Sequence, residues 1–243
     1  MPALFWPEGP ARPECPGPGD VHVWASNVDH VVDDAILSVR ERQRADAFVF
    51  DHDARRYRAT KVMQRQVLGA YTGVPPEQLT FGSEVREKPT IAPGQGPPAL
   101  TFNLSGSGGL ALIAIAFSRS IGVDLETPRD DIETMGIAER YFHPLEIEAI
   151  KAETDSALRR QTFYRCWTRK EAYMKALGEG LYLPMESFAV ELAPVSRPSL
   201  LDCAEGLAEA QEWTLIDLSV QATFFGAVAV RGPVETVTTW MWP

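Results

Sequence analysis

The feature that most constrains the fold is an order of elements that occurs twice along the chain. The apolar run "GLALIAIAF" (residues 109–117) has the length and composition of a buried strand, and "TFFGAVAV" (residues 223–230) echoes it. In the first half, a strand-like segment at 21–26 precedes helical patterns at 33–50 and 53–72. In the second half, strand-like 121–126 precedes helical patterns at 131–142, 144–152 and 157–177, followed by strand-like segments at 187–192, 212–218 and 223–230. The sequence therefore predicts an α+β chain of two similar halves, 1–119 and 120–243, and such pairs commonly hold a ligand cleft between them.

Composition excludes several classes of protein. The chain has 243 residues, 45% of them hydrophobic and 23% charged, and no apolar run long enough to span a membrane. The first 20 residues are too rich in proline for a signal peptide, and we expect an extended arm there. Three scattered cysteines and four scattered histidines form no zinc-binding spacing, which favours a reducing, cytoplasmic setting. Any metal is therefore expected to be a hard ion such as Mg²⁺, held by carboxylates.

The net charge of −10 disfavours nonspecific binding of nucleic acid. The charge is nevertheless uneven, because eight of the 23 basic residues lie between positions 40 and 65: Arg40, Arg42, Arg44, Arg55, Arg56, Arg58, Lys61 and Arg65. Two interpretations stay open for this stretch. It is either the site of a particular anionic ligand or a helix surface with interspersed ion pairs.

Acidic residues stand out in two later segments. In "IGVDLE", Asp124 and Glu126 are two residues apart, so both point to one face of a strand. In "WTRKEAYMKALGEGL" (residues 167–181), Glu171 and Lys175 share one helix face. Three carboxylates with a lysine suit Mg²⁺-assisted phosphoryl chemistry, in which cations neutralise phosphate charge. The alternatives are a strand end that emerges into water and a surface ion pair, and spacing alone leaves them open.

These two segments together resemble a known signature. "IGVDLE", followed 41 residues after Glu126 by "WTRKEAYMKALGEGL", is similar to the motifs G-[VI]-D-x-E and W-x-x-K-E-A-x-x-K-x-x-G-x-G-L of the 4′-phosphopantetheinyl transferases. The chain length and the upstream "EKP" (87–89) and "FNLSGSGG" (102–109) resemble the large, surfactin-type (Sfp-like) subgroup most closely. The resemblance covers about residues 21–230, without the proline-rich arm and the final "VETVTTWMWP".

The resemblance implies a fold, a reaction and residue roles. The fold would be a pseudo-dimer of two α+β halves with the active site in the cleft between them. The reaction would move the 4′-phosphopantetheine arm of coenzyme A to a serine of an acyl or peptidyl carrier protein and release adenosine 3′,5′-bisphosphate. Asp124, Glu126 and Glu171 match the Mg²⁺ ligands. Glu171 also matches the residue that helps deprotonate the serine, and Lys175 the lysine that contacts the coenzyme A phosphate.

The resemblance also implies a coenzyme A site in the first half. Arg44 and Arg56 fall where the family has basic residues around the 3′-phosphate, and Lys88 and Ser105 match further ligand contacts. Two positions depart from the family. Gly106 stands where the family has a histidine that contacts the 3′-phosphate, and Glu87 replaces the glycine before Lys-Pro. We expect activity to survive, with weaker affinity for coenzyme A or altered selectivity, since losing such a contact costs about 1.5–3 kcal/mol.

Two other functions remain to be weighed. One is a carrier-binding protein of the same fold that is catalytically impaired, a possibility raised by Gly106. The other is an unrelated Mg²⁺-dependent phosphotransferase or nuclease, which no P-loop or other nuclease-like motif supports. We expect a cytoplasmic monomer that binds neither nucleic acid nor membrane. The sequence does not distinguish fatty-acid, polyketide and nonribosomal-peptide carriers.

Overall fold

The computed structural model describes residues 6–82, 88–178, 183–203, 206–218 and 223–243. Its contacts divide the chain into two compact units. The N-terminal unit comprises Trp6–Ser118 and Thr236–Pro243, and the C-terminal unit comprises Arg119–Glu235. The final strand thus joins the N-terminal unit, although it belongs to the second half in sequence.

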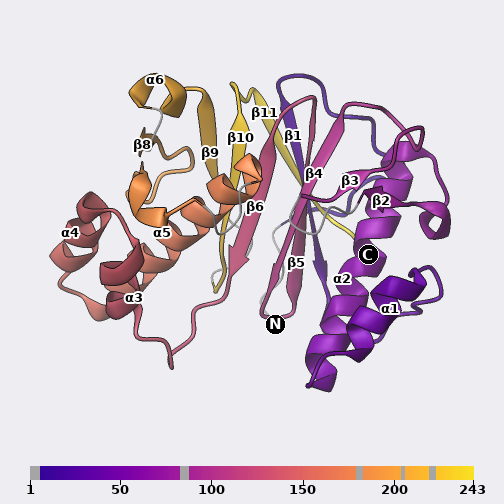
Figure 1. The fold of residues 1–243 in the computed structure, drawn as a ribbon, viewed down its shortest axis with the longest axis horizontal. Helices are drawn as coiled ribbons and strands as arrows, with labels where there is room; N and C mark the ends of the chain where they lie inside the picture. The colour runs from indigo at the N-terminus through magenta and orange to yellow at the C-terminus, as the bar shows by residue number, and fades with distance from the viewer. Residues whose placement is uncertain (1–5, 83–87, 179–182, 204–205, 219–222) are drawn as a thin grey trace. The chain divides into compact units, whose positions relative to one another are not determined.

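The N-terminal unit is built on a four-stranded sheet of order β11-β1-β5-β4 (Figure 1). Its strands are β1 (Asp20–Asn27), β4 (Leu100–Ser107), β5 (Leu110–Phe117) and β11 (Thr236–Met241), and β2 (Phe81–Gly82) pairs with β3 (Thr90–Ile91). Strands β1, β5 and β4 are antiparallel, whereas β11 runs parallel to β1. The helices are α1 (Val39–Asp46) and α2 (Asp51–Thr72), with a 3-10 helix at Pro76–Gln78.

Helix α2 covers this sheet with an apolar face. Met63, Leu68 and Tyr71 pack in one buried cluster with Phe102 of β4 and Trp24 of β1. The helix ends at Gly73, which adopts φ 72°, a left-handed conformation that favours glycine. The predicted span, 53–72, is confirmed in full, and the helix begins two residues earlier, at Asp51.

The first predicted helix, 33–50, was too long. The α1 helix begins after Ser38, whose hydroxyl accepts the amide of Glu41 while the Glu41 carboxylate accepts the amide of Ser38. This reciprocal cap fixes the start of the helix. The last strand, β11, was not predicted from the sequence. Trp240 of β11 packs on Trp24 with ring centroids 4.7 Å apart, and this buried aromatic contact helps to hold β11 beside β1.

The C-terminal unit has a three-stranded antiparallel sheet of order β6-β10-β9, covered by the long helix α5 (Figure 1). The strands are β6 (Ile121–Glu126), β9 (Trp213–Leu218) and β10 (Phe225–Arg231), with β7 (Ala189–Val190) paired to β8 (Leu200–Asp202). The helices are α3 (Thr134–Tyr141), α4 (Pro144–Ala152), α5 (Ser156–Leu177) and α6 (Leu207–Ala210), with a 3-10 helix at Met185–Ser187.

Caps define helix α5. The Asp155 carboxylate accepts hydrogen bonds from the amides of Ala157 and Leu158 at the start of the helix, and Gly178 ends the helix at φ 81°.

The α+β class predicted from the sequence is confirmed. No helix within the described part of the chain is long and apolar enough to cross a lipid bilayer.

Candidate active site

Gly122 of β6 sets how closely helix α5 approaches the sheet. A Cβ at position 122 would lie 2.9 Å from the Lys175 carbonyl carbon and closer still to the Ala172 carbonyl oxygen and the Ala176 amide nitrogen. Real Cβ atoms do not come so near, so only glycine allows the helix backbone to rest on the strand. Because side chains alternate along a strand, Gly122, Asp124 and Glu126 share the face on which α5 packs.

This close approach brings Lys175 onto Asp124. The Lys175 Nζ donates to Asp124 Oδ1 at 2.6 Å. The Lys175 side chain is 30% exposed and the Asp124 side chain only 5%. Glu171, one turn earlier on α5, lies within electrostatic range of both groups. Burial raises the pKa of Glu171, and the charge of Asp124 raises it further, while Lys175 opposes the shift. The predicted residues Asp124, Glu171 and Lys175 therefore form one cluster, and the ion pair is not a solvated surface pair.

The donor types of this cluster fit a hard divalent cation, although a complete ligand set is not assembled. Asp124 and Glu171 repel one another through their charges, and a cation between them would relieve that repulsion. Glu126 lies at the end of β6 on the same face, opposite Phe225 of β10. Among the described residues, however, no group of three or more histidine, cysteine or acidic side chains is close enough to hold a metal ion.

Lys170, adjacent to Glu171, has a structural role in the buried core. Its Nζ donates to both carboxylate oxygens of Glu146 and to the Phe188 carbonyl, each at 2.7 Å. Both charged side chains are almost fully buried, at 0% and 1% exposure. This pair fastens α5 to α4 and to the segment before β7, so it fixes the rotation of the helix that presents Glu171 and Lys175.

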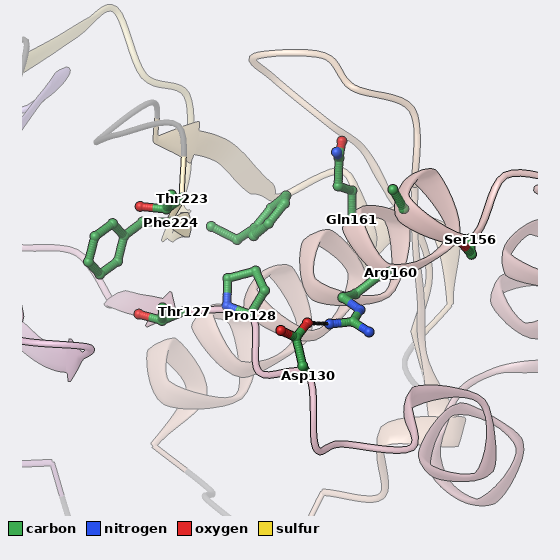
Figure 2. A pocket seen from close by; sticks show the side chains of 10 residues that line it. Thr127, Pro128, Asp130, Ser156, Arg160, Gln161, Thr223 and Phe224 are labelled. Atoms are coloured by element: carbon green, nitrogen blue, oxygen red, sulfur yellow. Dashed lines mark hydrogen bonds and ion pairs between the residues drawn. The ribbon is translucent and has the colours of Figure 1, made fainter. Parts of the chain in front are cut away.

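A pocket of about 740 Å³ lies just beyond the end of β6. Its apolar lining residues include Pro128, Phe224 and Phe225. Arg160 and Gln161 of α5 also line it (Figure 2). Arg160 is paired with Asp130 at the rim. The lining begins with Thr127, the residue after Glu126, and Asp124, Glu126 and Glu171 are not among the lining residues.

A second pocket, of about 330 Å³, belongs to the N-terminal unit. It lies between α2 and the β4–β5 turn, where Gly108 and Gly109 adopt φ values of 57° and 86°. Its lining residues include a guanidinium, hydroxyls and two aromatic rings in contact at 5.4 Å between centroids: Val28, Phe48, Asp53, Arg56, Tyr57, Thr60, Gly106, Ser107, Gly108, Gly109 and Leu110. The rings and hydroxyls suit a nucleoside, and Arg56 is the one lysine or arginine among the lining residues that could meet a phosphate.

The structure brings some of the predicted coenzyme A residues together and leaves others apart. Arg56 and Gly106 line this second pocket. Arg44 is exposed in the last turn of α1 and lies within electrostatic range of Tyr57 in the pocket wall. Ser105 precedes Gly106 on β4 and so points to the opposite face of the sheet.

Lys88 precedes β3 and is not among the residues that line the pocket. Burial lowers the pKa of Lys88 to about 8. Glu87, the other departure noted before this lysine, lies outside the described residues, as do Gly180 and Leu181 of the second motif.

Gly106 is not required by the backbone. It lies within strand β4 and is absent from the positions with positive φ. A Cβ there would come no nearer than 3.4 Å, to the Leu110 carbonyl oxygen, which is an ordinary contact. The strand can therefore accommodate a side chain at this position.

The basic stretch mixes ion pairs with exposed charges. Arg65 is buried against Glu41 at 2.7 Å, and Arg58 binds Asp34 and Asp46. Arg56 donates to both oxygens of Asp29 at 3.2 Å. The interpretation as a helix surface with ion pairs is thus correct for much of the stretch, and Asp29 had no signal in the sequence because it lies 27 positions before its partner.

Comparison with known proteins identifies the class. Residues 120–225 match the 4′-phosphopantetheinyl transferase superfamily, and residues 24–118 match the family described as 4′-phosphopantetheinyl transferase, N-terminal. The 4′-phosphopantetheinyl transferase HetI of Nostoc sp. (strain PCC 7120) is 36% identical over 218 residues, which cover 88% of each chain. This chain belongs to the 4′-phosphopantetheinyl transferase superfamily and is an enzyme of that class.

Two further relatives have related names. A 4′-phosphopantetheinyl transferase of Bacillus subtilis is 32% identical over 65% of this chain and 67% of its own length. The human L-aminoadipate-semialdehyde dehydrogenase-phosphopantetheinyl transferase is 27% identical over 82% of this chain and 69% of its own. The N-terminal family match and the human relative point toward a subgroup other than the surfactin type.

Proposed function

We propose that the protein transfers 4′-phosphopantetheine from coenzyme A to a serine of an acyl or peptidyl carrier protein, with Mg²⁺, and releases adenosine 3′,5′-bisphosphate. The observation that carries this proposal is the cluster of Asp124, Glu171 and Lys175 at the contact of β6 and α5. It combines two carboxylates of the kind that binds hard cations with one ammonium group. This is the charge distribution that phosphoryl transfer requires.

Glu171 is proposed as the general base. Its carboxylate takes the proton from the serine Oγ, which forms a bond to the phosphorus next to the pantetheine. The bond from that phosphorus to the bridging oxygen breaks, and the oxygen leaves with adenosine 3′,5′-bisphosphate. Lys175, held by Asp124, neutralises the charge that develops on the departing phosphate.

Asp124, Glu126 and Glu171 would hold the Mg²⁺, which supplies charge neutralisation at the pyrophosphate when it is bound. Asp124 also orients Lys175 through the 2.6 Å contact between Lys175 Nζ and Asp124 Oδ1. Gly122 and the buried Lys170–Glu146 pair keep the three side chains in register by fixing the position of α5.

The pocket of the N-terminal unit is proposed to hold the 3′-phosphate and adenine of coenzyme A. Arg56 contributes charge, Tyr57 and Phe48 an aromatic surface, and Thr60 a hydroxyl. Arg44 adds positive potential at the same pocket wall. Lys88 and Ser105 remain proposed ligand contacts on the basis of the motif.

The pocket beyond β6 is proposed to receive the serine-bearing segment of the carrier. Its lining begins at Thr127, the residue after Glu126, and its apolar walls with polar Gln161 suit a short peptide segment (Figure 2). We also propose that the protein acts as a cytoplasmic monomer.

Intact-mass measurement tests the reaction. Several apo carriers from fatty-acid, polyketide and nonribosomal-peptide systems are incubated with the protein, coenzyme A and Mg²⁺. We expect at least one carrier to gain the phosphopantetheine mass on serine. If the protein binds carriers and none is modified, the catalytically impaired homologue is the correct function.

A further inference from the structure

The proposed 3′-phosphate pocket contains a carboxylate that competes for its arginine. Asp29, directly after β1, accepts from Arg56 Nε at its Oδ1 and from Nη2 at its Oδ2, both at 3.2 Å. The two side chains are 33% and 31% exposed, so ligand and solvent can reach the pair. The Asp29 side chain rests against Gly109, where a Cβ would lie 3.4 Å from Oδ2. Asp29 therefore lies at the edge of the pocket that Arg56 and Gly109 line.

The charges of this pocket do not favour a doubly charged phosphate. Among the residues that line it, Arg56 is the one lysine or arginine, and Asp53 adds a negative charge. The hydrogen bonds from Arg56 lower the pKa of Asp29, with smaller contributions from Arg55 and His52, so Asp29 stays ionised at neutral pH. A phosphate at Arg56 must therefore share the guanidinium with an existing anion.

Because residue 106 is glycine, the pocket lacks a second side chain that could recognise the 3′-phosphate. A side chain would fit there, as the 3.4 Å Cβ contact shows, yet the residue is glycine and contributes neither charge nor hydrogen bond. Among the residues that line the pocket, Arg56 is then the one cation that can select for the 3′-phosphate, and Asp29 already engages it. Tyr57 and Phe48, the proposed contacts of the adenosine part, carry no charge and so would not distinguish the two forms of the coenzyme.

We propose that Asp29 is a specificity-determining residue that weakens selection for the 3′-phosphate, so that the enzyme accepts 3′-dephospho-coenzyme A nearly as well as coenzyme A. This inference rests on the proposed function, since it concerns the donor of that reaction. Asp29→Asn removes the competing charge and keeps the size of the side chain. We expect the preference for coenzyme A over the dephospho form to rise about tenfold, the size of one charge-assisted hydrogen bond.

Calorimetry separates this proposal from catalysis. The dissociation constants of adenosine 3′,5′-bisphosphate and of adenosine 5′-monophosphate are measured for the wild type and for Asp29→Asn, and kcat/KM is measured with both coenzymes. The matched control is Asp34→Asn, which removes the same charge from the ion pair of Asp34 and Arg58. This pair is similarly exposed, with Arg58 at 26% and Asp34 at 35%. The control should leave the ratio of the two affinities unchanged. Arg56→Gln in the Asp29→Asn background should abolish the gain.

Three results would overturn the inference. One is a strong wild-type preference for coenzyme A, and another is an unchanged ratio in Asp29→Asn. The third is a reduced ratio, which would mean that Asp29 orients Arg56 toward the phosphate. A wild type that modifies carriers but shows any of these results refutes the role of Asp29 alone. A wild type that modifies no carrier refutes the proposed function instead.

Discussion

Replacing Gly122 with alanine tests whether the position of α5 controls catalysis. The new Cβ would lie 2.9 Å from the Lys175 carbonyl carbon, and nearer to backbone atoms of Ala172 and Ala176. An ordinary contact distance of 3.4 Å requires the Lys175 carbonyl carbon to move by about 0.5 Å. The Ala172 oxygen and the Ala176 nitrogen must move further, so the helix must shift by roughly 1 Å. None of these atoms can rotate away, because all belong to the backbone of one helix.

The shift should separate Glu171 and Lys175 from Asp124. A misplacement of about 1 Å at reacting groups can cost about 10²-fold, so we expect kcat/KM for an apo carrier to fall by at least about that factor. Overpacking typically costs about 1–3 kcal/mol of stability, so the melting temperature should fall as well. Activity is therefore measured well below the melting temperature, with circular dichroism to verify folding.

Gly226→Ala is the matched control. It makes the same change on β10 of the same sheet, on the opposite face, where a Cβ would meet Leu218 Cβ at 3.3 Å. We expect at most a small loss of stability and nearly normal turnover. Normal turnover in folded Gly122→Ala would refute the reasoning, since the helix position would then not limit the reaction.

Four further predictions concern charge. Glu171→Gln should lower turnover by at least about 10²-fold. Because the folded protein raises the pKa of Glu171, ionisation of this group costs stability as the pH rises through that pKa, and metal-free Glu171→Gln should melt higher than the wild type at neutral pH. That gain should vanish below the ordinary glutamate pKa, and a lower melting temperature at neutral pH would contradict it. Chelation should abolish carrier modification, and Mg²⁺ or Mn²⁺ should restore it, whereas full activity in excess chelator would exclude the metal. Gly106→His should strengthen coenzyme A binding more than turnover, with little change in melting temperature because a Cβ fits; equal effects on dephospho-coenzyme A would exclude a phosphate contact. Since burial lowers the pKa of Lys88 to about 8, coenzyme A affinity should weaken as the pH rises past that value, and Lys88→Arg should flatten this dependence; a wild-type affinity independent of pH would exclude the contact.

Sequence alone predicted the parts of the molecule that local chemistry specifies. Strand β6 has the bounds expected from its apolar run, and α5 begins one residue earlier than expected, between Asp155 and Gly178. Helix caps, left-handed glycines and apolar periodicity involve residues close together in the sequence, so the sequence alone is enough to recognise them. Strand β4 escaped notice because its Ser-Gly-Ser end has little strand propensity, and pairing with β5 forms it instead.

Tertiary structure decided which charges act together. The sequence offered Lys170, Glu171 and Lys175 as neighbours on one helix, yet Lys170 is buried against Glu146, 24 positions away, while Lys175 reaches Asp124, 51 positions away. Likewise Arg56 meets Asp29, and β11 joins a strand more than two hundred residues earlier. The sequence by itself therefore determined the family, most of the longer elements and the residue types of the candidate site. The fold decided how the ionised groups pair, because pairing depends on distance and burial; for Lys175 and Asp124 these arise only once helix α5 packs on Gly122.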